Sequence, residues 1–230
     1  MFDKFEKAVV INLPERLDRR RDTVAELERV GATGASFFSA IRPTSAGVFG
    51  SRGEHGCFLS HMNVLKENQA AKSLIVMEDD VAFSPSFGSR SSIVSSLPDN
   101  WDIFYAGHYQ LPEVRVEWTR DGLVEVDGSV EFIGAHCYGI RGPALPKLLS
   151  FCETLLNSKQ PPDRCMPFDG AINIARRELG LRTFAAIPPL AHQRPSRTDI
   201  ANVRWFDRIK PLEPIVYALR KVKHRLDART

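Results

Sequence analysis

The sequence lacks several features that would assign it to a familiar class of protein. Its 230 residues include only four cysteines, without a CxxC pair, which argues against a disulfide scaffold and fits a reducing compartment. No apolar run approaches the ~18 residues of a membrane span. No Asn-x-Ser/Thr acceptor is present, and neither GxxxxGK[ST] nor GxGxxG occurs, so no phosphate-loop motif is available. Met1–Lys7 holds no basic segment followed by an apolar run, and we therefore expect a cytoplasmic protein.

The charge of the chain is nearly balanced except at its end. Its 31 Lys+Arg and 28 Asp+Glu leave a net charge of +3, too little to require a nucleic-acid or membrane partner. Residues 204–230 hold 8 basic and 3 acidic side chains, against 23 and 25 in residues 1–203. We predict one domain over residues 1–203 and a basic amphipathic helical tail over 204–230. The tail either packs on the domain or contacts an anionic membrane peripherally at its cytoplasmic face. Nucleic acid is not expected, because no aromatic residues interleave with the basic ones.

Apolar strands alternate with helical patterns in the first half of the chain. Strands are expected at Ala8–Leu13, Ala35–Ile41 and Ser73–Met77, with helices over 17–30 and 54–71 between them. This alternation is typical of βαβ crossovers and predicts an α/β fold, a Rossmann-like and mostly parallel sheet flanked by helices. The second half predicts further strands at 101–105, 131–140 and 183–187, a polar hairpin over 113–126, and helices over 91–97, 143–156 and 169–179.

Three carboxylates, Glu78, Asp79 and Asp80, directly follow the third strand. Strand ends of α/β sheets face the ligand crevice, and alternation places Glu78 and Asp80 on one side, with Cα atoms roughly 6.6 Å apart. Oxygen ligands favour Mg²⁺ or Mn²⁺, which suits the diphosphate of a nucleotide. Two alternatives stay open: a solvated acidic turn, or a single nucleophilic aspartate of a phosphotransfer enzyme or hydrolase.

Segments upstream of this strand end make the pattern distinctive. They are VINLPERLDRR from Val10, Ser39 to Ile41, and GEHGCFLSH from Gly53 to His61. Together with IVMEDDV they resemble glycosyltransferase family 25, which comprises bacterial lipopolysaccharide galactosyltransferases and collagen galactosyltransferases. Weaker matches follow at WDIFYAG, GAHCYGI and PFDGAIN. The resemblance implies a GT-A fold, a UDP-sugar donor such as UDP-galactose, and inverting transfer to a glycan or lipid-linked glycan, as in lipopolysaccharide biosynthesis.

The resemblance also implies roles for particular residues. Asp80 and Glu78 are expected to hold the metal, with His192 or Gln193 completing its shell or contacting the diphosphate. Asp169 is expected to act as the general base, although it could instead cap a helix. The residues expected around the nucleotide sugar are Asn12, Leu13, Arg16, Arg19, Ala40, Ser60, Glu78 and Asp79.

Further residues have two interpretations each. His136 and Tyr138 are expected either at the acceptor or, for Tyr138, in the strand core. Arg194 could neutralise phosphate. His61 is more typical of a structural helical histidine than of a ligand.

Two other functions compete with a glycosyltransferase. A nucleotidyltransferase would also use carboxylate-bound Mg²⁺ on an α/β sheet, although no phosphate loop supports it. A catalytically silent module that binds a sugar nucleotide or a partner would keep the sheet without turnover. The intact acidic triplet favours the enzyme.

Overall fold

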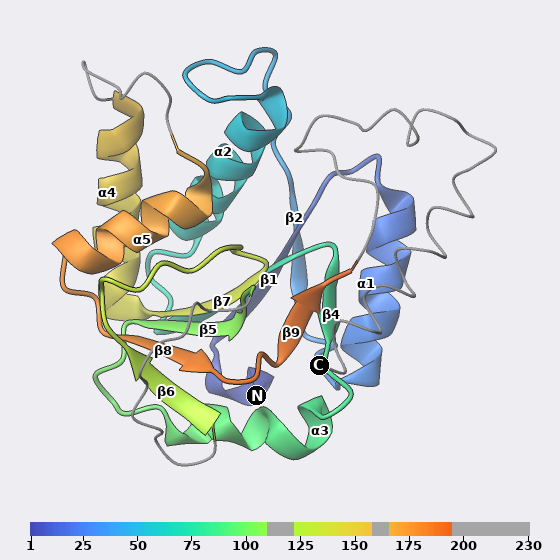
Figure 1. Cartoon of the computed structure of the whole chain (residues 1–230). Helices are drawn as coiled ribbons and strands as arrows, with labels where there is room; N and C mark the ends of the chain where they lie inside the picture. The colour runs from blue at the N-terminus through green and yellow to red at the C-terminus, as the bar shows by residue number, and fades with distance from the viewer. Residues whose placement is uncertain (110–121, 158–165, 195–230) are drawn as a thin grey trace.

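The computed structural model describes residues 1–109, 122–157 and 166–194. Within them, the strands form a nine-stranded sheet with helices on both faces (Figure 1). The strands are β1 (Lys7–Asn12), β2 (Ser36–Ser39), β3 (Ser73–Glu78), β4 (Val81–Phe83), β5 (Ile103–Gly107), β6 (Leu123–Val126), β7 (Cys137–Arg141), β8 (Thr183–Ala186) and β9 (Ala191–Gln193). The helices are α1 (Leu17–Arg29), α2 (Arg52–Glu67), α3 (Phe87–Arg90), α4 (Leu145–Asn157) and α5 (Phe168–Glu178), with 3₁₀ turns at Phe2–Lys4, Ser91–Ser96 and Gly142–Ala144.

The sheet combines parallel and antiparallel pairing. Its order is β2-β1-β3-β7-β5-β8-β6, while β4 pairs with β9 and β9 also pairs with β5. β1 runs parallel to β2 and β3, as crossovers through α1 and α2 require. β7 runs antiparallel to β3 and β5, and β6 runs antiparallel to β8. The predicted α/β class is confirmed, but the sheet is mixed and not mostly parallel as expected, because the second half of the chain adds the antiparallel pairings of β7, β6 and β4.

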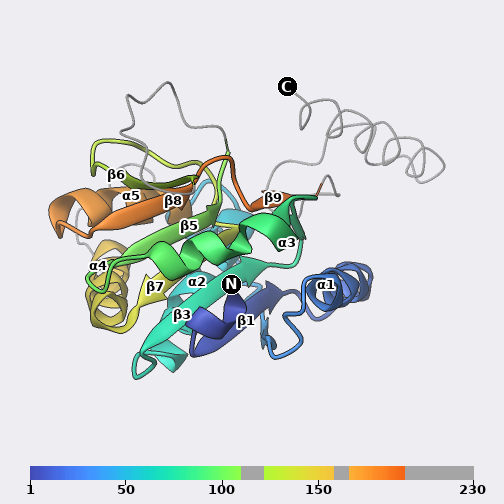
Figure 2. The same ribbon diagram turned by 90° about the horizontal axis from the view of Figure 1, so that it is seen from below.

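The sheet divides the apolar core into two clusters. On one face, α2, α4 and α5 contribute Phe58, Leu148 and Ile172. On the other, α1 and α3 contribute Leu27 and Phe87. Figure 2 shows β1 and β3 side by side near α1. Both strands are buried along most of their length, which explains their continuous apolar sequence.

Helix α1 buries two residues, Thr23 and Leu27, whereas Val24 between them is 37% exposed. Thr23 is buried because its hydroxyl donates to the carbonyl oxygen of Asp79 at 2.6 Å. Through this hydrogen bond, helix α1 holds the backbone of the acidic strand end in place.

Helix α2 starts at a side-chain cap and ends four residues earlier than expected, at Glu67. The hydroxyl of Ser51 accepts a hydrogen bond from the Glu54 amide, as an N-cap does. The Glu54 carboxylate accepts one from the amide of Gly50, the residue before the cap. A Cβ on Gly56 would lie 2.5 Å from the Ile41 carbonyl oxygen. Only glycine allows α2 to approach the segment after β2 this closely.

The strand predicted over residues 131–140 is too long at its start, because β7 begins at Cys137. The backbone groups before β7 form hydrogen bonds with side chains of α5 instead of with a neighbouring strand. Asn173 accepts from the Phe132 amide and donates to the Phe132 carbonyl, and Asp169 accepts from the Gly134 amide. The short strands β4 and β9 were not predicted at all.

Some expectations fall beyond the described ranges. The tail over 204–230 and most of the polar hairpin lie outside them, although the last strand of that hairpin is β6. Among the described helices, none is long and apolar enough to cross a bilayer.

Candidate active site

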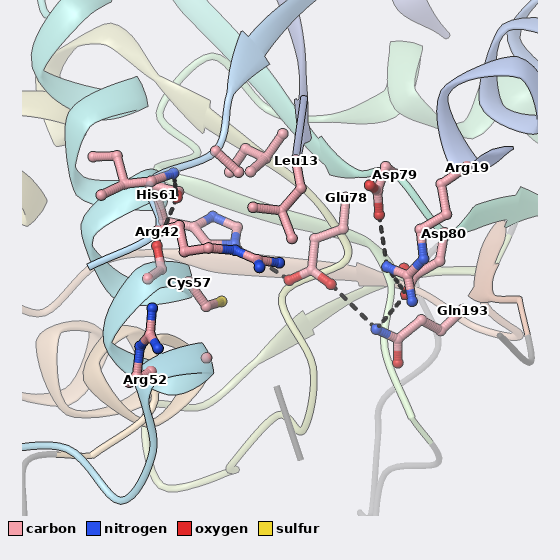
Figure 3. Close-up of a pocket in the computed structure, with 16 residues that line it drawn as sticks. Leu13, Arg19, Arg42, Arg52, Cys57, His61, Glu78, Asp79, Asp80 and Gln193 are labelled. Atoms are coloured by element: carbon pink, nitrogen blue, oxygen red, sulfur yellow. Dashed lines mark hydrogen bonds and ion pairs between the residues drawn. The ribbon is translucent and has the colours of Figure 1, made fainter. Parts of the chain in front are cut away.

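A cavity of about 360 Å³ opens at the carboxyl ends of β1 and β3, against the first turns of α2 (Figure 3). Most of the residues predicted for the nucleotide and the metal line it, namely Leu13, Arg19, Ala40, Ser60, Glu78, Asp79 and Asp80. Gln193, the alternative to His192 for the metal shell, also lines it. The sequence did not assign a role at this site to the other polar residues of the wall, which are Arg42, Arg52, Cys57 and His61. The volume is that of a small-molecule site.

The three acidic residues point in two directions, as strand alternation predicted. The Gln193 amide donates from Nε2 to Glu78 Oε2 at 3.1 Å and to Asp80 Oδ2 at 3.3 Å. Asp79 turns away from this pair and accepts from Asn12 Nδ2 at 2.7 Å. The NH₂ group of Gln193 thus lies between two carboxylates, in the place where a cation would be attracted.

Arg19 compensates part of this negative charge. Its guanidinium lies 2.7 Å from Asp79 Oδ1 and 3.3 Å from Asp80 Oδ2. Arg19 therefore lies at the site as predicted, but its charge faces the two carboxylates and not the space expected for the nucleotide sugar. Arg16 instead pairs with Asp18 at 2.9 Å and is not part of the cavity wall.

Asp80 has the electrostatic character of a cation ligand. Burial and the neighbouring Glu78 raise its pKa to about 7. Its Oδ1 atom is buried and has no hydrogen-bond partner among the described residues, which normally indicates a missing ligand or a functional group. For Glu78, burial is the largest effect and raises the pKa, but the hydrogen bond from His61 and the electrostatic interactions with His61, His136 and Arg19 together outweigh it and lower the pKa. These donors fit a hard divalent cation such as Mg²⁺ or Mn²⁺.

The backbone of the acidic turn is fixed from α1 and from the end of β9. Arg194 donates to the Asp79 carbonyl at 2.8 Å and to the Thr23 hydroxyl at 2.9 Å, and its amide donates to the Asp80 carbonyl at 2.6 Å. Arg194, considered for phosphate, therefore acts here as a positioning residue.

His61 is a buried structural histidine, as expected, and it also contacts Glu78 at the site. Its ring is buried and stacks on Phe168 with centroids 4.3 Å apart. Its Nδ1 lies 2.9 Å from the Tyr138 hydroxyl, and its Nε2 lies 3.3 Å from Glu78 Oε1. The i, i+4 spacing of Cys57 and His61 is the sequence signal that would have placed both on one helix face.

His192, predicted as a metal ligand, does not line the cavity. It pairs with Ala82 in the β4–β9 ladder, whereas its neighbour Gln193 lines the wall. Successive residues of a strand face opposite sides, so β9 brings Gln193 to the carboxylates.

Asp169 lies in the first turn of α5, whose N-cap is Pro167, so it is not the N-cap itself. Its two carboxylate oxygens accept from the Gly134 and Gly170 amides at 2.9 Å. It is outside the cavity wall, but its charge helps to raise the pKa of Cys57, after burial and Glu78. Ser60 has a local role, since its hydroxyl joins the Gly56 carbonyl to the Ile41 amide.

Of the two residues considered for an acceptor pocket, neither reaches this cavity. Tyr138 is fully buried in the core and His136 is 1% exposed. Burial lowers the pKa of His136, against the opposing charge of Glu78, so its imidazole is neutral at pH 7.

Three comparisons relate this site to known proteins. The sequence model of Glycosyltransferase family 25 (LPS biosynthesis protein) matches residues 45–117, which include α2, β3 and the acidic turn. Procollagen galactosyltransferase 1 of Danio rerio is 27% identical, over 82% of this chain and 36% of that protein. Inactive glycosyltransferase 25 family member 3 of Homo sapiens is 29% identical, over 72% of this chain and 31% of that protein. The chain thus spans about a third of the length of these two relatives.

A solved structure supports the fold. A glycosyltransferase involved in the glycosylation of the major capsid of PBCV-1 superposes with a TM-score of 0.51 at 9% identity, over 94% of this chain and 98% of that one. At this identity the likeness concerns the fold alone, and it confirms the predicted GT-A type.

Proposed function

The chain is a relative of glycosyltransferase family 25, and on that premise we propose that it transfers a hexose from a UDP-sugar to a hydroxyl group of a glycan. Galactose is the first sugar to test, because the Danio rerio relative is named a galactosyltransferase. The proposal includes metal dependence and inversion at the anomeric carbon. Its main support is the pair Glu78 and Asp80, which flank one amide at the edge of a cavity of small-molecule size.

Residues of this chain would divide the binding of the donor among them. Glu78 and Asp80 would hold Mn²⁺ or Mg²⁺, which supplies positive charge to the diphosphate as it leaves. Arg42, which also pairs with Glu15 at 2.9 Å, and Arg52 line the same cavity and would offer charge to the phosphates. Leu13 gives the nucleotide an apolar surface. Arg19 and Arg194 hold the acidic turn in place.

Asp169 is the proposed general base for the acceptor hydroxyl. Its carboxylate is oriented by two backbone amides, and it adjoins Phe168, which stacks on His61 at the cavity wall. A base held on the side opposite the diphosphate is what a single inverting displacement requires.

The experiment measures UDP release from a panel of UDP-sugars with Mn²⁺, comparing the wild type with Asp80→Ala. We expect release that is fastest for one sugar and lost in Asp80→Ala. Glu125→Gln is the matched control, since Glu125 of β6 lies outside the cavity wall and forms an exposed ion pair with Arg182, the residue before β8. Equal release in wild type and Asp80→Ala would remove the acidic turn from the mechanism.

A binding module without turnover is the second candidate, because one relative is named inactive. Calorimetry of UDP binding in the presence of Mn²⁺ separates the two. Binding that needs Asp80, with no UDP release from any sugar, would favour the module.

A further inference from the structure

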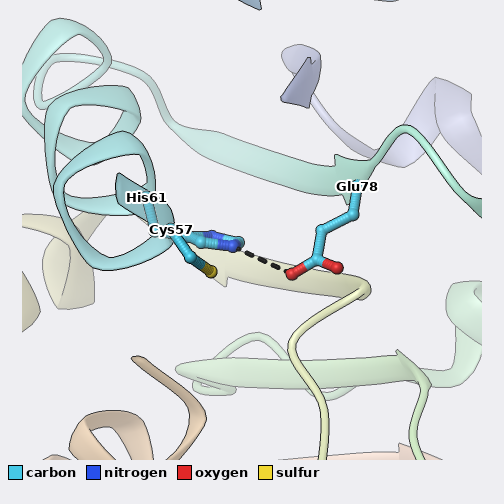
Figure 4. Close-up of side chains that lie close together, drawn as sticks. All are labelled: Cys57, His61 and Glu78. Atoms are coloured by element: carbon cyan, nitrogen blue, oxygen red, sulfur yellow. Dashed lines mark hydrogen bonds and ion pairs between the residues drawn. The ribbon is translucent and has the colours of Figure 1, made fainter. Parts of the chain in front are cut away.

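A second group of possible metal ligands adjoins the acidic turn. Cys57 and His61 lie one turn apart on α2 and face Glu78 at the end of β3 (Figure 4). One ligand atom from each residue lies within 4.8 Å of the others. All three residues line the cavity, so an ion could reach them from solvent.

The chemistry of this group differs from that of the acidic turn. A thiol, an imidazole and a carboxylate are the ligands of Zn²⁺, whereas Mg²⁺ and Mn²⁺ prefer oxygen alone. Tetrahedral Zn²⁺ with bonds of about 2.0–2.3 Å places neighbouring ligand atoms roughly 3.3–3.6 Å apart. His61 Nε2 and Glu78 Oε1 are already 3.3 Å apart. Cys57 Sγ lies within 4.8 Å of a ligand atom of each of these residues, and the ion would draw it closer.

The imidazole is oriented for this purpose before any ion binds. The Tyr138 hydroxyl contacts Nδ1 at 2.9 Å, which leaves Nε2 for the cavity side, and the Phe168 ring holds the imidazole plane by stacking. Metal-bound histidines characteristically use their second nitrogen in such an outer hydrogen bond. This support is independent of the clustering itself.

We propose that Cys57, His61 and Glu78 form a binding site for Zn²⁺ or another thiophilic divalent cation, with a fourth coordination position open to the cavity. Binding would release the thiol proton to solvent, because the thiolate is the ligand. The imidazole would stay neutral and carry its proton on Nδ1, where it would donate to the Tyr138 oxygen and leave Nε2 free to ligate the ion.

Glu78 connects this site to the acidic turn. Its Oε1 faces His61 and its Oε2 faces Gln193, which also contacts Asp80. One carboxylate would therefore be shared by two cations that repel each other. Zn²⁺ at the thiol site should weaken Mn²⁺ binding at Glu78 and Asp80, and linkage makes the effect reciprocal. This coupling rests on the proposed function, whereas Zn²⁺ binding itself does not.

Cobalt spectroscopy tests the site without any activity assay. Co²⁺ added to the full chain should produce a thiolate-to-Co²⁺ charge-transfer band that Zn²⁺ abolishes. Cys57→Ser should lose the band and bind Zn²⁺ at least about tenfold more weakly, with its melting temperature recorded to show that it folds. Asp80→Asn is the matched control and should keep the band. Wild type without the band, or Cys57→Ser with it, would overturn the site.

A second measurement tests the coupling. Free Mn²⁺ is followed by electron paramagnetic resonance while Zn²⁺ is added. We expect Zn²⁺ to release bound Mn²⁺ from the wild type at concentrations that leave Cys57→Ser loaded. Equal release from both proteins would show direct competition at the acidic turn and contradict the coupling. If the wild type binds no Mn²⁺ but keeps the cobalt band, the proposed function fails while the thiol site stands.

Discussion

The hydroxyl of Tyr109 donates a hydrogen bond to Oε1 of Gln193. This contact turns the NH₂ group of Gln193 toward Glu78 and Asp80, where it donates to both. Tyr109 follows β5 and Gln193 ends β9, so two strands set the orientation of one amide at the acidic turn. The NH₂ group of this amide therefore lies between two carboxylates, at a position that would attract a cation.

This relationship predicts the effect of Tyr109→Phe. A cation must displace the Gln193 NH₂ group, and the Tyr109 hydroxyl holds that group in place. Removing the hydroxyl should therefore tighten Mn²⁺ binding a few-fold and destabilise the metal-free protein by about 1 kcal/mol. Mn²⁺ titration and denaturant unfolding measure the two effects. Weaker Mn²⁺ binding in Tyr109→Phe would mean that the hydroxyl helps the cation instead.

The raised pKa of Asp80 predicts that Asp80→Asn stabilises the metal-free protein. A carboxyl whose pKa is raised on folding, here to about 7 from 3.8, destabilises the native state once it ionises. The variant should gain on the order of 2 kcal/mol, or roughly 4–8 °C in melting temperature, above pH 7 in a chelator. The gain should shrink as the pH falls from 7 toward 4.

Metal addition should reverse the order of stability in that experiment. Mn²⁺ should raise the melting temperature of the wild type and leave Asp80→Asn unchanged, because a ligand stabilises only the state that binds it. If the stability gain of Asp80→Asn over the wild type in chelator did not change with pH, ionisation of Asp80 would not be its cause.

Removal of Arg19 should destabilise the protein strongly. Arg19 is 13% exposed and lies within 3.3 Å of both Asp79 and Asp80, so Arg19→Gln leaves two buried carboxylates without their cation. We expect a loss of about 3 kcal/mol, partly recovered by Mn²⁺. Arg21→Gln, at an exposed position of the same helix, should change the unfolding free energy by less than about 0.5 kcal/mol.

Asp169→Asn should separate chemistry from binding. If Asp169 is the general base, transfer should fall about 10²- to 10⁴-fold, while calorimetry shows unchanged binding of UDP and Mn²⁺. Asp22→Asn, on the exposed side of α1, is the control. A fall in UDP affinity as large as the fall in rate would assign Asp169 to donor binding or to folding.

The elements of the first half of the chain were predictable because their signals are local. The apolar runs of β1 and β3 and the periodic pattern of α2 depend on residues close in sequence. The predicted strand began too early, before Cys137. The backbone amides there donate to the side chains of Asn173 and Asp169, more than thirty residues away, and not to a neighbouring strand. The β-branched and aromatic residues of this segment favour a strand by type, and they do not reveal these distant contacts.

The sequence by itself determined the α/β class and the acidic turn, since strand alternation already separates Asp79 from Glu78 and Asp80. Only the tertiary structure decided which groups surround that turn. The pairing of β4 with β9 brings Gln193 to it from more than a hundred residues away, and the packing of α2 on β3 and α5 brings His61 and Cys57. Residue spacing can place Cys57 and His61 on one helix face, but it carries no trace of long-range strand pairing or helix packing, so it could not show that these side chains and Gln193 meet at the turn.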